Sequence, residues 1–267
     1  TAIVARGLGI PAVVGAKQAS RLIRDGDWIV VDGDAGVVII DPTPQVLDEY
    51  LSRQRQTRLA QQQLGALRDT PAVTRDGVAV KLLANIELPG DAAQAVAAGA
   101  VGVGLFRSEF LFMGHHELPD EARQFAAYRE AVEGMAGLPV TIRTLDIGAD
   151  KPLDGETLDA DNASALGLRA IRWSLTEPAV FRTQLRAILR ASAFGPVKIM
   201  IPMLAHAQQI DQVFAQIALA KVELDATGLR YDPNVPVGAM IEIPAAVLAL
   251  PLFLKRMDFL SLGTNDL

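Results

Sequence analysis

Cysteine is absent from all 267 residues, and aromatic side chains are scarce, with only two Trp and three Tyr. The lack of thiols excludes disulfides, cysteine-ligated zinc and a thiol nucleophile within this sequence. Because 50% of the residues are nevertheless apolar, the core must be built mainly from Ala, Val, Leu and Ile. This composition is typical of a cytoplasmic α/β protein with a sizeable core.

Blocks of Lys and Arg are also absent, and the net charge of −6 is spread along the chain. This distribution argues against a nucleic-acid partner, which would require a basic surface. The most apolar stretch, residues 235–254, contains Glu242 and three prolines. We expect it to form a buried strand followed by a helix and not to insert into a membrane.

The first residues of the sequence include no polar lead-in, and the last residues are an apolar run that breaks into a Gly-Thr-Asn-Asp turn. The chain opens with TAIVARGLGIPAVVG, without an initiator Met, and closes with FLSLGTNDL at a turn. We interpret the sequence as a piece of a longer protein.

The first part of the chain consists of short apolar runs separated by glycines. The stretch DWIVVDGDAGVVII predicts a β-hairpin with arms at residues 30–31 and 37–40. A Gln-, Arg- and Leu-rich stretch follows and predicts a solvated helix that ends near residue 69. The predicted organisation is a first segment at 1–41, a helical linker at 42–75 and a larger domain at 76–267.

The larger domain alternates between apolar strand patterns and helix patterns. Six strands are predicted, at 78–85, 100–106, 139–147, 197–203, 235–243 and 257–263, and a seventh is suspected within 164–172. Helices are predicted at 91–98, 120–133 and 176–193, the last with Thr176 as its N-cap, and a further helix carries apolar residues at 210, 213, 214 and 217. Uniformly apolar strands between helices indicate a parallel sheet covered by helices.

Two α/β architectures fit this pattern, an open doubly wound sheet and a (β/α)8 TIM barrel. No G-x-G-x-x-G motif follows the first strand, and polar residues gather at the carboxyl ends of several strands, where a barrel builds its site. We therefore favour the barrel. Since an intact barrel has eight strands, we expect this one to be truncated before its last strand.

Charged and polar residues follow the predicted strands: Arg107, Arg143, Asp146, Lys151, Arg169, Glu242, Asn265 and Asp266. Converging guanidinium groups would bind the oxygens of a small anion, because Arg pairs with carboxylate and phosphate through two N–H donors. Carboxylates in the same place would repel each other unless a divalent cation joined them, and Mg²⁺ prefers oxygen ligands. The pattern predicts a Mg²⁺ site for a phosphorylated or dicarboxylic small molecule.

A structural interpretation of the same residues stays open at this point. Each Arg taken singly could form a surface salt bridge, and Asn265 with Asp266 could be only a turn pair. Glu242 is harder to explain in this way, because an ionised side chain in so apolar a stretch needs a partner. The three His residues have no metal-ligand spacing, and we expect them to be solvated.

The motifs GVGLFRSEFLFM, TIRTLDIGADKP, LGLRAIR, IMIPM, MIEIPAA and FLSLGTNDL, in this order, resemble the phosphoenolpyruvate (PEP)-utilising enzymes. The resemblance covers nearly the whole chain and is greatest to enzyme I of the bacterial sugar phosphotransferase system. It implies a PEP-binding TIM barrel preceded by the end of a swivelling phosphohistidine domain, here residues 1–41.

The resemblance also implies roles for individual residues. Arg107 and Arg143 would hold the phosphate and carboxylate of PEP, with Lys151 and Arg169 nearby. Glu242 and Asp266 would ligate Mg²⁺, and Asn265 would orient the phosphoryl group together with Asp266.

In that family the phosphoryl group passes from PEP to a His of the swivelling domain and then to the carrier protein HPr, and the barrel forms a homodimer. The family's phosphoryl-accepting His would precede Thr1, and its Cys acid would follow Leu267. No catalytic residue of either kind is therefore expected within these residues.

Several related functions remain possible at this stage. Pyruvate phosphate dikinase and PEP synthase share the swivelling domain and the barrel. A fused multiphosphoryl transfer protein with an enzyme I section would have the same sequence features in these residues. A Mg²⁺-dependent pyruvate aldolase or lyase could use the same barrel, although it needs no swivelling domain. A non-enzymatic scaffold with merely structural charges is the remaining alternative.

The missing acceptor His leads to a direct prediction for this 267-residue chain. Incubation with PEP and Mg²⁺ should leave its intact mass unchanged, because none of its own His residues stands in the acceptor motif. A mass increase of one phosphoryl group would contradict this interpretation.

Overall fold

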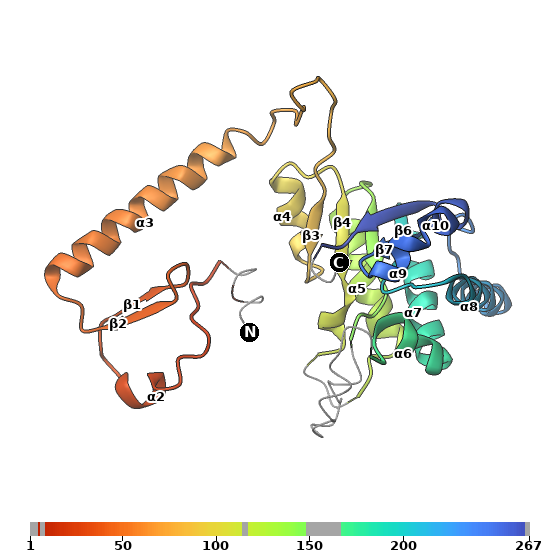
Figure 1. The fold of residues 1–267 in the computed structure, drawn as a ribbon, viewed down its shortest axis with the longest axis horizontal. Coiled ribbons are helices and arrows are strands. Elements are labelled where there is room, and N and C mark those ends of the chain that lie inside the picture. The colour runs from red at the N-terminus through yellow and green to blue at the C-terminus, as the bar shows by residue number, and fades with distance from the viewer. Residues whose placement is uncertain (1–4, 6–8, 114–116, 148–166, 265–267) are drawn as a thin grey trace. The chain divides into compact units, whose positions relative to one another are not determined.

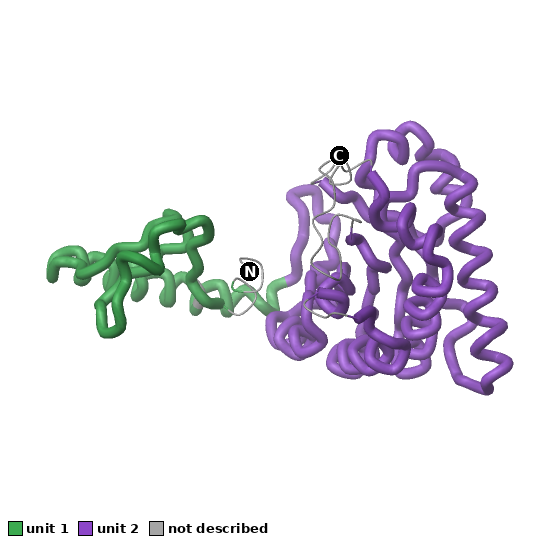
Figure 2. The backbone as a smooth tube through the Cα atoms, turned by 90° about the horizontal axis from the view of Figure 1, so that it is seen from below, with its two compact units in different colours: residues 1–70 green, residues 71–267 purple. Residues whose placement is uncertain are grey.

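The computed structural model describes residues 5, 9–113, 117–147 and 167–264 of the chain. The chain divides into two compact units, Thr1–Thr70 and Pro71–Leu267, which Figure 2 shows in different colours. The predicted domain boundaries at residues 41 and 75 remain predictions.

The first unit contains a β-hairpin between two helices (Figure 1). After the short α2 (Ala19–Leu22), β1 (Ile29–Asp32) pairs antiparallel with β2 (Val37–Ile40), which confirms the predicted hairpin. The α3 helix (Pro44–Gly65) follows, with the Thr43 side chain accepting a hydrogen bond from the Val46 N–H. Nearly all of its described side chains are exposed, which confirms the predicted solvated helix.

The second unit is an α/β fold with a curled parallel sheet of six strands (Figure 1). The strands are β3 (Ala84–Ile86), β4 (Val103–Arg107), β5 (Val140–Arg143), β6 (Val197–Ile201), β7 (Val237–Ile241) and β8 (Phe259–Leu262). Each pairs in parallel with the next along the chain. Five of the six predicted strands are confirmed, whereas the first, predicted at 78–85, overlaps β3 only at residues 84 and 85. The sequential order differs from that of a doubly wound sheet, in which the order reverses.

The suspected seventh strand is wrong where the structure describes it. Residues 164–166 lie outside the described part, and α6 (Ala170–Thr176) occupies residues 170–172, which is half of the remainder. Ala170, Ile171 and Ser174 are buried, a spacing that fits one face of a helix and not one face of a strand. β5 pairs directly with β6, so no strand lies between them.

The main helices pack against one another in chain order. The α4 helix (Asp91–Ala97) contacts α5 (Glu121–Gly134), which contacts α7 (Pro178–Ala191), which contacts α8 (Ala207–Ala226). The short helices are the 3-10 turn η1 (Ser108–Leu111), α9 (Pro244–Leu248) and α10 (Leu250–Arg256). Strands and helices that follow the same order are typical of a sheet that winds in one direction, as in a half-barrel.

The α7 helix shows why this layer is stable. Phe181, Leu185, Ile188 and Leu189 are all buried on its inner side, as their spacing predicts. Its predicted N-cap is wrong, because Thr176 is the last residue of α6 and its hydroxyl donates to the Trp173 carbonyl. A Pro in the first turn of α7 allows the second helix to begin directly after the first.

The apolar stretch 235–254 forms β7, α9 and the first part of α10, in agreement with the predicted strand and helix. Across the described ranges, no helix combines the length and the hydropathy needed to cross a membrane.

The contact between α5 and α7 includes a carboxylate shared by two guanidinium groups. Glu121 accepts from Arg186 Nε and Arg190 Nη1, both at 2.6 Å. Burial raises the pKa of Glu121, but hydrogen bonds from the two Arg residues outweigh it and leave the pKa below its ordinary value. The ionised carboxylate therefore stabilises the folded protein.

The Glu121→Gln variant should lower the free energy of unfolding at neutral pH by about 1 kcal/mol. Because the folded pKa of Glu121 is lowered, its contribution is present above the unfolded pKa and is lost as the pH falls through the folded pKa. Urea denaturation should therefore separate variant from wild type at neutral pH and bring them together in acid. The Glu133→Gln variant removes an exposed pair with Arg129 within α5, and should change stability much less.

Candidate functional site

Three arginines lie near one edge of the sheet. Two of them end adjacent strands, and the third precedes a helix. Arg107 ends β4 and Arg143 ends β5, and the two residues are paired in the strand register. Arg169 directly precedes α6. Since all strands run parallel, the sheet brings these residues to one edge, as the sequence predicted.

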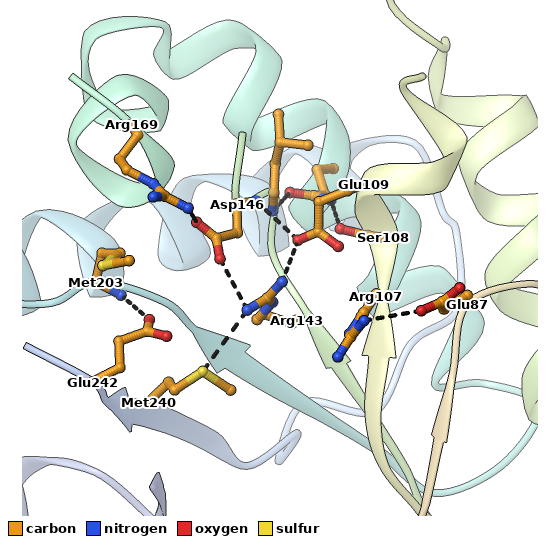
Figure 3. A network of polar contacts seen from close by, with 12 residues as sticks. Glu87, Arg107, Ser108, Glu109, Arg143, Asp146, Arg169, Met203, Met240 and Glu242 are labelled. Carbon is orange, nitrogen blue, oxygen red and sulfur yellow. Dashed lines mark hydrogen bonds and ion pairs between the residues drawn. The ribbon is translucent and has the colours of Figure 1, made fainter. Parts of the chain in front are cut away.

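Arg143 is the least exposed of the three, and Figure 3 shows it between Glu109 and Asp146. Its side chain is 12% exposed, and its two Nη atoms bind different carboxylates, Glu109 Oε1 at 2.9 Å and Asp146 Oδ2 at 2.9 Å. Nη1 also lies 3.8 Å from the sulfur of Met240 on β7. This arrangement connects the ends of β4, β5 and β7 through one guanidinium group.

Asp146 joins two of the arginines. Its Oδ1 accepts from Arg169 Nη2 at 3.1 Å, while its Oδ2 binds Arg143. Its backbone N–H donates to Glu109 Oε1 at 3.1 Å. The Nε atoms of Arg143 and Arg169 are buried, and within the described structure neither has a hydrogen-bond acceptor. The two cations therefore keep N–H donors that the described protein groups do not satisfy.

Arg107 is the more accessible cation, with a side chain that is 32% exposed. Its Nη1 binds Oε1 of Glu87, the residue that follows β3, at 2.9 Å. A pair with this exposure contributes little to stability and can exchange for another anion at modest cost.

Glu242 follows β7 and is 3% exposed. Its Oε1 accepts a hydrogen bond from the Met203 N–H at 2.8 Å, which provides the partner that its burial requires (Figure 3). Gly263, after β8, approaches it so closely that a Cβ there would lie 2.8 Å from the Glu242 Cβ and 3.1 Å from Oε2. Any larger residue at 263 would displace the carboxylate.

The backbone is strained at two points beside these side chains. Ala170 follows Arg169 with a φ of 49°, and Met203, which donates to Glu242, has a φ of 54°. Non-glycine residues rarely adopt such angles, and they persist where the surrounding structure holds them. Both positions fix the direction of a site residue.

The pKa values of Glu109 and Arg143 are both raised, but for different reasons. Burial raises the pKa of Glu109, and the positive charge of Arg143 only partly offsets this effect. For Arg143, burial lowers the pKa, but the charges of Glu109, Asp146 and Glu242 outweigh it and raise the pKa above its usual value. Arg143 is therefore a permanent cation held by carboxylates.

Known proteins identify the family of this fold and site. The family description "PEP-utilising enzyme, PEP-binding domain" matches residues 61–267, and "PEP-utilising enzyme, mobile domain" matches residues 1–36. The chain belongs to the PEP-utilising enzymes. The resemblance carried by the sequence motifs is thereby confirmed.

Among the relatives of this PEP-utilising enzyme are three proteins named phosphoenolpyruvate-protein phosphotransferase. The chain is 66% identical to that of Cupriavidus necator, 45% to that of Geobacillus stearothermophilus and 43% to that of Staphylococcus carnosus. Each comparison covers 100% of this chain but only 46 to 47% of the relative. The chain thus spans about half the length of these relatives.

The remaining predicted site residues of this PEP-utilising enzyme, Lys151, Asn265 and Asp266, lie outside the described residues. So do His115 and His116, whereas His206 occupies the N-cap position of α8. Sequence reasoning gave no role to Glu87 and Glu109, although both matter for the arginines. The only signal for Glu109 was its place in FRSEF, two residues after Arg107.

The described residues fit a magnesium site in part. Within the described ranges, no group of three or more His, Asp or Glu side chains could hold a metal ion. Glu242 is one enclosed carboxylate at the end of a strand, and a backbone N–H directs it. Mg²⁺ commonly takes one or two protein carboxylates together with ligand oxygens and water, so one such ligand is compatible with it.

The Glu109→Gln variant should change how stability depends on pH. Because the folded pKa of Glu109 is raised, its favourable contribution is present below the unfolded pKa and is lost as the pH rises through the folded pKa. The variant stays neutral and should not show this loss. Urea denaturation over a pH series should record the difference, and Glu130→Gln, on the exposed side of α5, serves as the control. Parallel curves for wild type and Glu109→Gln would contradict the prediction.

Proposed function

We propose that this chain is the PEP-binding part of a phosphoenolpyruvate-protein phosphotransferase, in the manner of enzyme I. The observation that carries the proposal is the pairing of Arg107 with Arg143 at the ends of adjacent strands. Two guanidinium groups at neighbouring strand ends suit a ligand with a phosphate and a carboxylate, because Arg pairs with either through two N–H donors.

The charge of the central cluster supports a role for a bound cation. Arg143 and Arg169 supply two positive charges, whereas Glu109, Asp146 and Glu242 supply three negative charges when ionised. An anionic ligand would meet net repulsion from these five groups alone. Further positive charge is needed before a phosphorylated carboxylate can bind here.

We propose three sources for this charge. Arg107 is the strand partner of Arg143 and is only partly buried. The family resemblance implies Lys151 as a second source of positive charge. Mg²⁺ is the third, with Glu242 and Asp266 as its protein ligands and Asn265 beside them to orient the phosphoryl group. When bound, the metal would neutralise charge on the phosphoryl and enolate oxygens of the ligand.

We propose that Arg107 and Arg143 contact the two anionic groups of PEP, with Arg169 and Lys151 close by. In the whole protein the phosphoryl group would move to a His of the swivelling domain and then to HPr, as part of sugar uptake. We further propose that the half-barrel belongs to a complete (β/α)8 barrel, that residues 1–41 belong to the swivelling domain, and that the whole enzyme is a cytoplasmic homodimer.

The main competing function is a Mg²⁺-dependent pyruvate aldolase or lyase on the same barrel. The match of residues 1–36 to a mobile domain favours phosphoryl transfer, since a lyase has no use for such a domain. By the same family resemblance, pyruvate phosphate dikinase and PEP synthase would share the swivelling domain and the barrel. The three relatives named as phosphotransferases favour enzyme I over them.

Isothermal titration of PEP into the chain should show binding with Mg²⁺ and weaker or no binding with EDTA. The Arg107→Met variant keeps most of the side-chain stem and should weaken binding by about 10- to 100-fold, the value of one or two lost charge-assisted hydrogen bonds. Arg129→Met, on the exposed side of α5, should bind like wild type.

The Glu242→Gln variant separates the metal from the rest of the site. Its amide oxygen can still accept the Met203 N–H, so folding should be preserved, while the charge available to Mg²⁺ is lost. We expect the EDTA effect to shrink in this variant. Binding that is equally strong in Arg107→Met and in wild type would exclude the proposed site.

A further inference from the structure

Gln184 is a buried amide on the inner side of α7. Its residue is 2% exposed, in a helix face otherwise made of Phe181, Leu185 and Ile188. Burial of an amide without hydrogen bonds would destabilise the fold, so its partners matter. Gln184 is not among the residues proposed to contact PEP or Mg²⁺.

All the polar atoms of this amide are used. Nε2 donates to Ser108 Oγ at 3.1 Å and to Tyr128 OH at 3.0 Å, and Oε1 accepts from the Leu145 N–H at 2.9 Å. A backbone N–H can only donate, so the amide oxygen must face Leu145 and the nitrogen must face the two hydroxyls. The orientation of the side chain is therefore determined by its surroundings.

Two of these partners directly precede the carboxylates that hold Arg143. Ser108 precedes Glu109, and Leu145 precedes Asp146. The amide thus connects the chain segment after β4 with the segment after β5. The hydrogen bond from the Asp146 N–H to Glu109 joins the same two segments.

Tyr128 gives the amide a rigid support from α5. It is fully buried, packs edge-on against Phe106 at 5.8 Å, and donates from its hydroxyl to Gln124 Oε1 at 3.4 Å. Gln124 Nε2 in turn donates to the Pro119 carbonyl at 2.8 Å. Because each group is held by the next, the amide has little freedom to move.

We infer that Gln184 is a positioning residue, which holds Glu109 and Asp146 at the spacing that directs the Arg143 guanidinium toward an anionic ligand. The inference rests on the proposed function in taking PEP as the ligand. It assigns to a residue of the helix layer a part in the geometry of the site at the carboxyl ends of the strands.

The Gln184→Met variant is the first test, because Met is unbranched, of similar length and apolar. Without the amide, the two segments lose their link, and the Leu145 N–H is left without its acceptor. PEP binding, measured by titration with Mg²⁺, should weaken by about tenfold. Ser108→Ala removes one of the three contacts and should weaken it by about threefold, which keeps the test available if Gln184→Met fails to fold.

The matched control is Ser192→Ala at the C-cap of α7. Ser192 is also buried, and its Oγ accepts from the Asp232 N–H at 2.8 Å, on the segment that precedes β7 at the amino end of the sheet. Both variants should lower the free energy of unfolding, but Ser192→Ala should leave the affinity for PEP within about twofold of wild type. Equal affinities in wild type and Gln184→Met, or equal losses in Gln184→Met and Ser192→Ala, would overturn the inference.

A second measurement needs no ligand. Isotope-edited NMR of the Glu side-chain carboxyl carbons, with Glu109→Gln to identify the Glu109 signal, should follow its titration directly. In Gln184→Met the segment that carries Glu109 loses its hydrogen bond to residue 184 and becomes more hydrated. The pKa of Glu109 should therefore fall toward its ordinary value.

The two measurements separate the inference from the proposed function. Wild-type protein that fails to bind PEP would refute the function, and the Glu109 titration would then decide the positioning role alone. An unchanged titration of Glu109 in Gln184→Met would refute the positioning role even if PEP binds to the wild type.

Discussion

The enclosed guanidinium group of Arg143 is the interaction on which the site depends. An isolated charge with this burial would strongly destabilise the fold, and two carboxylates, from the segments after β4 and β5, compensate for it. Because each carboxylate binds a different Nη atom, the group is fixed in its plane as well as in position. Arg169 is bound to the same cluster through Asp146, so the cluster also holds the residue that precedes α6.

This constraint explains the uneven burial of the three arginines. Arg143 is nearly enclosed, Arg169 is 25% exposed and Arg107 is 32% exposed. A gradient of this kind suits a site in which one cation provides a fixed reference and the others remain accessible to a ligand. The network of Gln184 and Tyr128 extends the support of that fixed cation into the helix layer.

Much of the fold followed from local pattern. Strands β4 to β8 were predicted because each is a short, mainly apolar run, whereas the first prediction overlapped β3 at only two residues. The inner face of α7 was predicted because Phe181, Leu185 and Ile188 recur at helical spacing. The errors arose where local signals were ambiguous. Residues 167–172 contain apolar residues that suit a strand or a short helix, and Thr176 is a good N-cap type that instead ends a helix. In both places tertiary packing decided between conformations of similar local preference.

By itself the sequence determined the parallel α/β class, the order of the strands and the cationic residues that follow them, because periodicity and residue type depend only on local order. Only the tertiary structure decided that Arg107 and Arg143 are register partners, that Glu109 and Asp146 share one guanidinium, and that Gln184 links their segments. Apart from the local pair of Arg143 with Asp146, these contacts join residues that are 34 to 76 positions apart in the chain. Such distances close only when the whole sheet and its helices pack, so no local pattern can report them.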